Sequence, residues 1–162
     1  MKIKLLSEAL MVQQKILEEL LDLLERETLD LADVIVEAIF TINGKKEEVV
    51  ARIQAYAAPL RKVIGEAAIS LGLSFDISLG DLAANLGQQG KRDVLLQREQ
   101  LNKVAERVRQ VAAMNHDIAE RFAASVTISL ELLTRIINQS NIYSAGGYQQ
   151  RPTGAVLINS EA

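Results

Sequence analysis

The sequence of 162 residues contains no cysteine and no tryptophan, and aromatic residues make up only 4% of it. The lack of cysteine excludes disulfides, thiolate nucleophiles and zinc–thiolate sites. Apolar residues still account for 49% of the chain, and they are mainly leucine, isoleucine, valine and alanine. This composition is typical of packed helices rather than of aromatic ligand pockets, and the length predicts one domain.

Basic residues are not in excess either, because the formal net charge is −3. General nucleic-acid binding needs a clear surplus of lysine and arginine, so we expect none. No apolar run approaches the ~20 residues that cross a bilayer, and we expect no stable membrane insertion. Glu8 interrupts the apolar stretch that follows Lys2, which argues against a signal peptide.

The residues that support catalysis are also scarce. His116 is the only histidine, and no cysteine accompanies it as a nucleophile. The spacing of Gly80, Gly87 and Gly90 matches neither a dinucleotide fingerprint nor a phosphate loop. We therefore expect no enzyme activity, no metal site and no cofactor.

Two long segments without glycine or proline, residues 1–43 and 91–145, repeat apolar residues at steps of three and four. This spacing predicts long amphipathic helices over about 2–43 and 92–141. The apolar stripe of the first segment changes phase beyond Leu24, which we interpret as a stutter in one continuous helix. Asn43 and Gly44 are expected to end that helix.

The remaining sequence predicts a second long helix over 45–71, ended by Gly72, and a short one over 78–86, opened by a capping box at Ser78. Pro59 is expected to kink the second long helix rather than to divide it. The predicted fold is all-α: an elongated antiparallel helical bundle or coiled coil of three long helices plus a short linker helix. A helical domain would cover 1–142, and an extended tail, flexible or docking, would cover 143–162.

Polar residues on these helices leave two interpretations open. Asn115 occupies a seam position, where it would either fix register and oligomeric state or position a partner. Between Glu18 and Glu37 the acidic residues outnumber the single base, Arg26, whereas bases predominate from Lys91 to Arg109. These stripes are either two solvated faces that attract each other weakly or docking surfaces for a charged partner.

Taken in order along the chain, these features resemble one known family. They are an acidic, leucine-rich first helix, the Lys-Lys-Glu-Glu opening at 45–48, Arg61, Asn115 on the third long helix and the segment Tyr143-Ser144-Ala145-Gly146-Gly147. Together they resemble the FlgN family of flagellar export chaperones. The tail departs from the family's Tyr-Gly-x-x-Gly form by carrying Ser144.

The resemblance implies a non-catalytic cytoplasmic chaperone, transiently at the flagellar export apparatus, that works in type III protein export. It would bind the carboxy-terminal helices of the hook-associated (hook–filament junction) proteins FlgK and FlgL, prevent their premature assembly and deliver them to the export gate. Tyr143 and Gly147 would dock on the gate protein FlhA. Client binding is assigned to the amphipathic end of the last helix, with these residues: Phe122, Val126, Leu130, Leu133, Ile136 and Ile137.

The apolar residues of that helix end support this role independently, because Leu130, Leu132 and Leu133 are too widely spread for a single seam. A short second helix would leave part of this surface uncovered for another helix. Our hypothesis is that Ile136 and Ile137 contact the client. The alternatives are a self-assembling structural coiled-coil protein, which would be a homo-oligomer, or another type III secretion chaperone.

Overall fold

The computed structural model describes residues 1–143 of the chain, with side chains through Asn138. Its four helices are α1 (Lys2–Ala32), α2 (Val36–Ile69), α3 (Leu79–Gln88) and α4 (Arg92–Tyr143). No strand occurs in these residues, so the prediction of an all-α fold is confirmed. The expected tail lies outside the described residues, apart from Tyr143.

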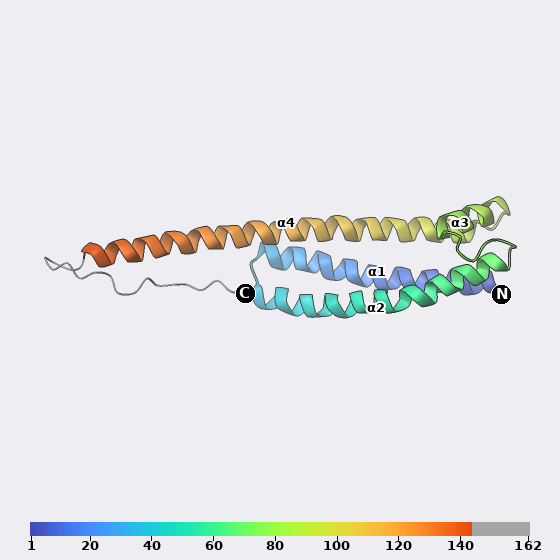
Figure 1. The fold of residues 1–162 in the computed structure, drawn as a ribbon, viewed down its shortest axis with the longest axis horizontal. Helices are drawn as coiled ribbons and strands as arrows, with labels where there is room; N and C mark the ends of the chain where they lie inside the picture. The colour runs from blue at the N-terminus through green and yellow to red at the C-terminus, as the bar shows by residue number, and fades with distance from the viewer. Residues whose placement is uncertain (144–162) are drawn as a thin grey trace. The chain divides into compact units, whose positions relative to one another are not determined.

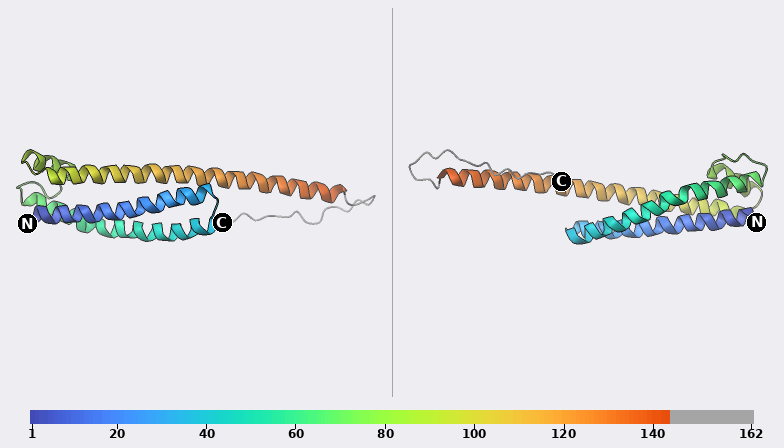
Figure 2. Two further views of the ribbon diagram at one scale, coloured as in Figure 1. Left: turned by 180° about the vertical axis from the view of Figure 1, so that it is seen from behind. Right: turned by 60° about the horizontal axis from the view of Figure 1, so that its bottom comes forward.

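The chain divides into two compact units, Met1–His116 and Asp117–Ala162. In the first unit, α1 and α2 form an antiparallel hairpin, and the first part of α4 runs beside α1 (Figures 1 and 2). The short α3 lies where α2 ends and α4 begins (Figure 1). The described part of the second unit is the remainder of α4, from Asp117 to Tyr143.

The expected end of the first helix at Asn43–Gly44 is wrong. The first helix stops at Ala32, and Gly44 lies inside α2. The chain turns at Asp33–Ile35, where the backbone N–H of Ile35 donates to the carbonyl of Asp30 at 2.9 Å. The phase change that we interpreted as a stutter therefore marks a reversal of the chain: Ile42 is buried because α2 folds back along α1.

Three helix ends use the same hydrogen-bonded motif. At each end a residue with positive φ is followed by an N–H that donates five residues back, as in a Schellman motif. Gly72 (φ 73°) and Gly90 (φ 83°) supply this conformation after α2 and α3, and the stop predicted at Gly72 is confirmed. After α1 the position is held by Val34 (φ 56°), a β-branched residue for which this conformation is costly.

The short helix α3 begins as predicted. The Ser78 hydroxyl accepts a hydrogen bond from the Asp81 backbone N–H at 3.0 Å and donates to Asp81 Oδ2 at 2.6 Å. This cap orients α3 so that its apolar side places Leu82 and Leu86 in the core. They pack there with residues of α1, α2 and α4, namely Leu6, Leu10, Ile64, Ala67, Ala68, Val94 and Leu101.

A second, smaller core lies nearer the α1–α2 turn. It is formed by α1, α2 and α4 through Ile16, Leu20, Leu23, Leu24, Val49 and Val111. Partly buried residues extend both cores along the helices, including Leu17 and Leu60 at the first core and Ile53 and Val108 at the second. The packing is almost entirely aliphatic, as the composition predicts.

Pro59 lies inside α2, which continues through it as one helix. Proline cannot donate to the carbonyl four residues earlier, that of Ala55. Both Pro59 and Ala55 are exposed, so water can satisfy this carbonyl. α2 bends along its length (Figure 1), and the prediction of a kinked rather than a divided helix agrees with this geometry.

Candidate functional site

The second unit presents an apolar helix surface to solvent. The six residues assigned to client binding are all exposed, each between 40 and 53%. They are Phe122, Val126, Leu130, Leu133, Ile136 and Ile137. Burying such side chains against another helix would contribute roughly 1.5–3 kcal/mol each when burial is complete.

These six positions share one side of the helix. With 3.6 residues per turn they fall within an arc of about 120°. Val111 and Asn115 fall within the same arc, and both are buried in the first unit. One apolar stripe thus runs along α4: its first part is covered by α1 and α2, and the side chains of its second part are exposed. We call the second part the α4 face.

Two further apolar residues of this part of α4 are exposed outside the arc. Leu132 is 57% exposed and lies next to the α4 face, whereas Ile128, which is 65% exposed, lies one turn from Ala124, nearer the opposite side of the helix. Leu132 was left out of the six candidates because it falls outside the seam spacing. Its four-residue step to Ile136 is the sequence signal that could have included it.

Three of the hydroxyl groups on this part of α4 already donate hydrogen bonds within the helix. Thr127 donates to the Ala123 carbonyl at 3.1 Å, Ser129 to that of Ser125 at 2.9 Å and Thr134 to that of Leu130 at 2.9 Å. Such i−4 bonds keep the hydroxyls close to the backbone. A partner would therefore meet mainly aliphatic side chains, and recognition would depend on shape and apolar burial.

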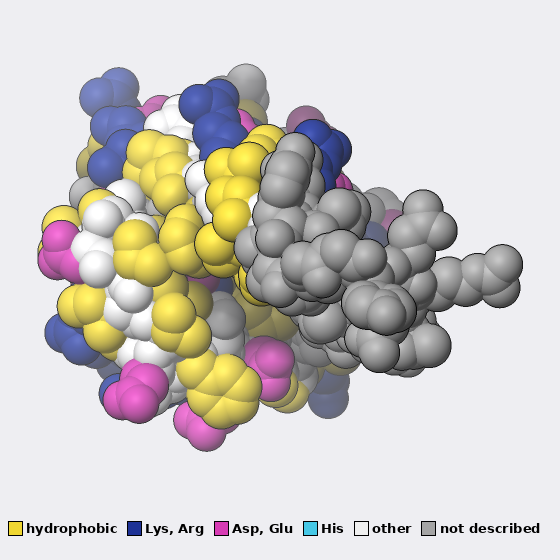
Figure 3. Space-filling view, turned by 90° about the vertical axis from the view of Figure 1, so that its left-hand side faces the viewer, with side chains coloured by type: hydrophobic (Ala, Val, Ile, Leu, Met, Phe, Trp, Pro, Cys, Tyr) yellow, Lys and Arg dark blue, Asp and Glu magenta, His cyan; other side chains and the backbone are white. Residues whose placement is uncertain are grey.

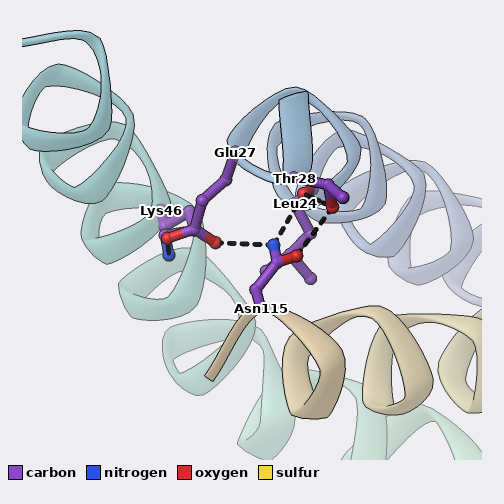
Figure 4. A network of polar contacts seen from close by, with 5 residues as sticks. All are labelled: Leu24, Glu27, Thr28, Lys46 and Asn115. Atoms are coloured by element: carbon purple, nitrogen blue, oxygen red, sulfur yellow. Dashed lines mark hydrogen bonds and ion pairs between the residues drawn. The ribbon is translucent and has the colours of Figure 1, made fainter. Parts of the chain in front are cut away.

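At the other end of the stripe, Asn115 is buried in a polar network that joins three helices (Figure 4). Its side-chain amide donates to the Leu24 carbonyl at 2.8 Å and to Glu27 Oε2 at 2.9 Å. Its Oδ1 accepts from the Thr28 hydroxyl at 2.6 Å. The second oxygen of Glu27 accepts from Lys46 Nζ of α2 at 2.5 Å.

Every polar atom of the Asn115 side chain is thus hydrogen-bonded, and the only buried carboxylate of the described residues is paired. The directional bonds favour one axial position of α4 against α1. A role of Asn115 in register remains a prediction, and this geometry supports it. Partner binding through Asn115 would first require this network to open.

The two residues assigned to gate docking are at or beyond the limit of the described residues. Tyr143 is the last residue of α4. Its side chain and the whole of Gly147 lie outside the part that the structure describes.

Other kinds of site are not supported within residues 1–138. No group of three or more His, Cys, Asp or Glu side chains in this part could hold a metal ion. None of its helices combines the length and the apolar character that a membrane span requires. Open grooves of about 350 to 480 Å³ lie along the α1–α2 hairpin, and both charged and apolar residues line each of them.

The charged stripes meet at one point. Arg107 Nη2 of α4 lies 3.5 Å from Glu25 Oε1 of α1, and both side chains are about half exposed. This agrees with two helix faces that attract each other weakly, since exposed pairs contribute about 0–1 kcal/mol. Glu27 differs from the rest of the acidic stripe, because it is buried.

Comparison with known proteins gives one match. A family model described as FlgN protein matches residues 1–151. No curated protein and no solved structure matches the chain. FlgN is a family of chaperones that bind flagellar hook-associated proteins, and it is not known as an enzyme family. Because the match covers nearly the whole chain, this protein belongs to the FlgN family of flagellar export chaperones.

Proposed function

We propose that this protein is a cytoplasmic chaperone for the hook–filament junction proteins FlgK and FlgL. It binds their carboxy-terminal helices on the α4 face, prevents their premature assembly and delivers them to the export gate. The observation that supports the site is the exposed apolar arc of α4, which continues the stripe buried in the first unit. An amphipathic client helix would cover it in the helix-in-groove mode.

The energetics favour a few anchors within this face. Leu133 and Ile136 are 53 and 52% exposed, which leaves much of each side chain available for burial. Interface energies concentrate in a minority of residues, and loss of one anchor commonly costs more than 1 kcal/mol. An aspartate at either position would also place a charge in an apolar interface.

The test is isothermal titration of the full chain with carboxy-terminal peptides of FlgK and FlgL. Leu133→Asp should weaken binding at least tenfold, and the pair Ile136→Asp/Ile137→Asp should abolish it. Ala124→Asp is the matched control, because Ala124 is exposed on the opposite side of the same helix. Equal affinities for Leu133→Asp and Ala124→Asp would rule out the α4 face as the client site.

Delivery is proposed to depend on Tyr143 and Gly147, which would contact the gate protein FlhA. The resemblance of the segment at 143–147 to the family's tail supports this assignment. Tyr143→Ala should retain client affinity and lose binding of the client complex to the cytoplasmic part of FlhA. Undiminished FlhA binding by Tyr143→Ala would overturn the assignment.

A copy of the same chain could also cover the α4 face. Light scattering of the protein with and without a client peptide separates the two cases. A chaperone should give a 1:1 complex with the client, whereas a self-assembling coiled coil should keep its oligomeric mass when the peptide is added.

A further inference from the structure

The turn between α1 and α2 carries a second exposed apolar surface, in the first unit. Phe40 is 82% exposed and Leu29 is 67% exposed, although the chain has only three phenylalanines. We define the turn surface as these five exposed residues: Leu29, Val34, Ile35, Val36 and Phe40. Figure 3 shows the side of the molecule that includes this turn, where hydrophobic side chains are interspersed with acidic ones.

A groove adjoins the turn surface. It has a volume of about 400 Å³ and lies between the end of α1 and the start of α2. Its apolar lining is formed by Leu23, Leu29, Ala38 and Ile42, and its polar lining by Arg26, Asp30, Glu37, Thr41 and Lys45. A concave site of this size, with Leu29 of the turn surface in its lining, can receive one anchoring side chain from a partner.

Val34 gives an independent sign that this surface has a use beyond folding. The helix ends after α2 and α3 place glycine at the equivalent position, which removes the steric cost of a positive φ. Val34 adopts a positive φ despite its steric cost, yet its side chain is 46% exposed and belongs to neither core. Strain of this kind is expected where the side chain contributes to binding rather than to stability.

Charge indicates what the turn surface would bind. The segment from Asp30 to Glu37 contains three acids, Asp30, Asp33 and Glu37, and no base. None of the three has an ion pair among the described residues, whereas Glu19, Glu25, Glu27 and Glu66 elsewhere in the unit are paired. The nearest bases in the groove are Arg26 and Lys45. An apolar patch flanked by unpaired carboxylates favours a partner with lysine or arginine beside its own apolar residues.

We propose that the turn surface docks a basic amphipathic helix of a partner protein. The apolar side of that helix would cover Phe40 and Leu29, with one side chain in the groove, and its basic residues would face Asp30, Asp33 and Glu37. An anionic lipid surface is disfavoured, because the same carboxylates would repel it. This site is separate from the α4 face and does not depend on the client assignment.

The test uses a labelled 18-residue model helix of leucine, alanine and lysine, and a twin in which glutamate replaces every lysine. Binding is measured by fluorescence anisotropy in the full chain with Leu133→Ser/Ile136→Ser, so that the α4 face contributes little. The lysine helix should bind at least tenfold more tightly than the glutamate twin. Neutralising the turn with Asp30→Asn/Asp33→Asn/Glu37→Gln should remove most of this difference and its dependence on salt.

Two sets of variants locate the site. Leu29→Ser/Phe40→Ser should weaken binding of the lysine helix at least tenfold, whereas Ile69→Ser/Leu96→Ser, a pair exposed elsewhere in the first unit, should leave it unchanged. All four side chains are exposed, so circular dichroism should show intact helices in both. Val34→Gly should raise the melting temperature and also weaken binding.

Three results would overturn the proposal. The first is unchanged binding by Leu29→Ser/Phe40→Ser, and the second is equal binding of the lysine and glutamate helices. The third is tighter binding to vesicles of phosphatidylglycerol than to the lysine helix, which would make the surface a membrane contact instead.

Discussion

Asn115 of α4 donates a hydrogen bond of 2.9 Å to Glu27 of α1, inside the first unit, where both side chains are buried. Lys46 of α2 holds the other oxygen of the same carboxylate. One buried carboxylate therefore connects all three long helices just before the end of the first unit at His116. The energetic cost of burying this charge is offset only while its partners remain in place.

Removal of Lys46 should be more damaging than removal of the whole ion pair. Lys46→Met leaves the Glu27 carboxylate buried without its cation, and we expect a loss of roughly 3 kcal/mol in the free energy of unfolding. The double variant Lys46→Met/Glu27→Gln should recover part of this loss, because a neutral amide costs less to bury. Urea unfolding followed by circular dichroism measures both, and equal stabilities of the single and double variants would contradict the account.

Asn115→Ala should also destabilise the unit, by about 1–3 kcal/mol, since Glu27 Oε2 loses its hydrogen bond and the Thr28 hydroxyl loses one of its two acceptors. The same unfolding measurement tests this. Asn102→Ala, an exposed asparagine on the same helix, is the matched control and should change stability by less than about 0.5 kcal/mol. A stable Asn115→Ala variant would show that the network contributes nothing to the packing of α4.

Replacing Gly65 of α2 by alanine should change the free energy of unfolding in opposite directions in two sequence backgrounds. A methyl group there would collide with the ring of Phe75, which packs directly on the glycine from the α2–α3 loop. Gly65→Ala should therefore lower the unfolding free energy in the native sequence. In a Phe75→Ala background the same change should raise it by about 1 kcal/mol, because alanine is a better helix former than glycine. The double-mutant cycle would contradict the contact if the two effects had the same sign.

The Lys2–Glu66 pair predicts a small dependence of stability on pH. Lys2 Nζ lies 2.6 Å from Glu66 Oε2, and this hydrogen bond, with the lysine's charge, lowers the pKa of the Glu66 carboxyl. A lowered pKa in the folded state stabilises the fold above the unfolded value of about 4.3, and this contribution is lost as the pH falls through the folded value. The stability lost on Glu66→Gln should therefore be constant above about pH 5.5 and shrink toward pH 3.

Lys2→Met supplies the control for that prediction. Without Lys2, the stability change caused by Glu66→Gln should depend much less on pH, because only the weaker attraction of Lys62, whose Nζ lies 3.9 Å from Glu66 Oε1, remains. Thermal unfolding at several pH values measures both series. An unchanged pH dependence in the Lys2→Met background would show that another group is responsible.

Periodicity and glycine placement predicted much of this fold. The 3–4 spacing identified α1, α2 and α4 as helices, and Gly72 and Ser78 located the end of α2 and the start of α3. These signals are local, because a cap or an αL glycine depends on residues a few positions apart. The fold class followed from them.

The α1–α2 turn could not be predicted in the same way. Its positive-φ position holds Val34, while an Asn-Gly pair about ten residues later offered a better local signal that the structure does not use. The choice is made by tertiary packing: reversal at Val34 lets Ile42 and Val49 lie against α1. Local propensity is a weak guide where packing opposes it.

The candidate site, like the fold, could be predicted from the sequence only in part. The exposed arc of α4 could be predicted from the apolar stripe of its sequence. A helix that is longer than the helices it packs against must expose some of its apolar residues. The burial of Glu27 was not predictable, since an acid among eight in one stripe gives no sign of which one is covered. The contact of Phe75 with Gly65 also depends on a loop path that spacing does not determine.

The central claim is that client helices lie on the exposed apolar arc of α4. Photo-crosslinking from benzoylphenylalanine tests it most directly, with the probe placed at Val126 or Leu133 on the arc and at Ala124 or Glu131 on the opposite side. The account predicts crosslinks to FlgK and FlgL from positions 126 and 133, and little from 124 and 131. Equal crosslinking from both sides, or crosslinks from 124 and 131 alone, would contradict it.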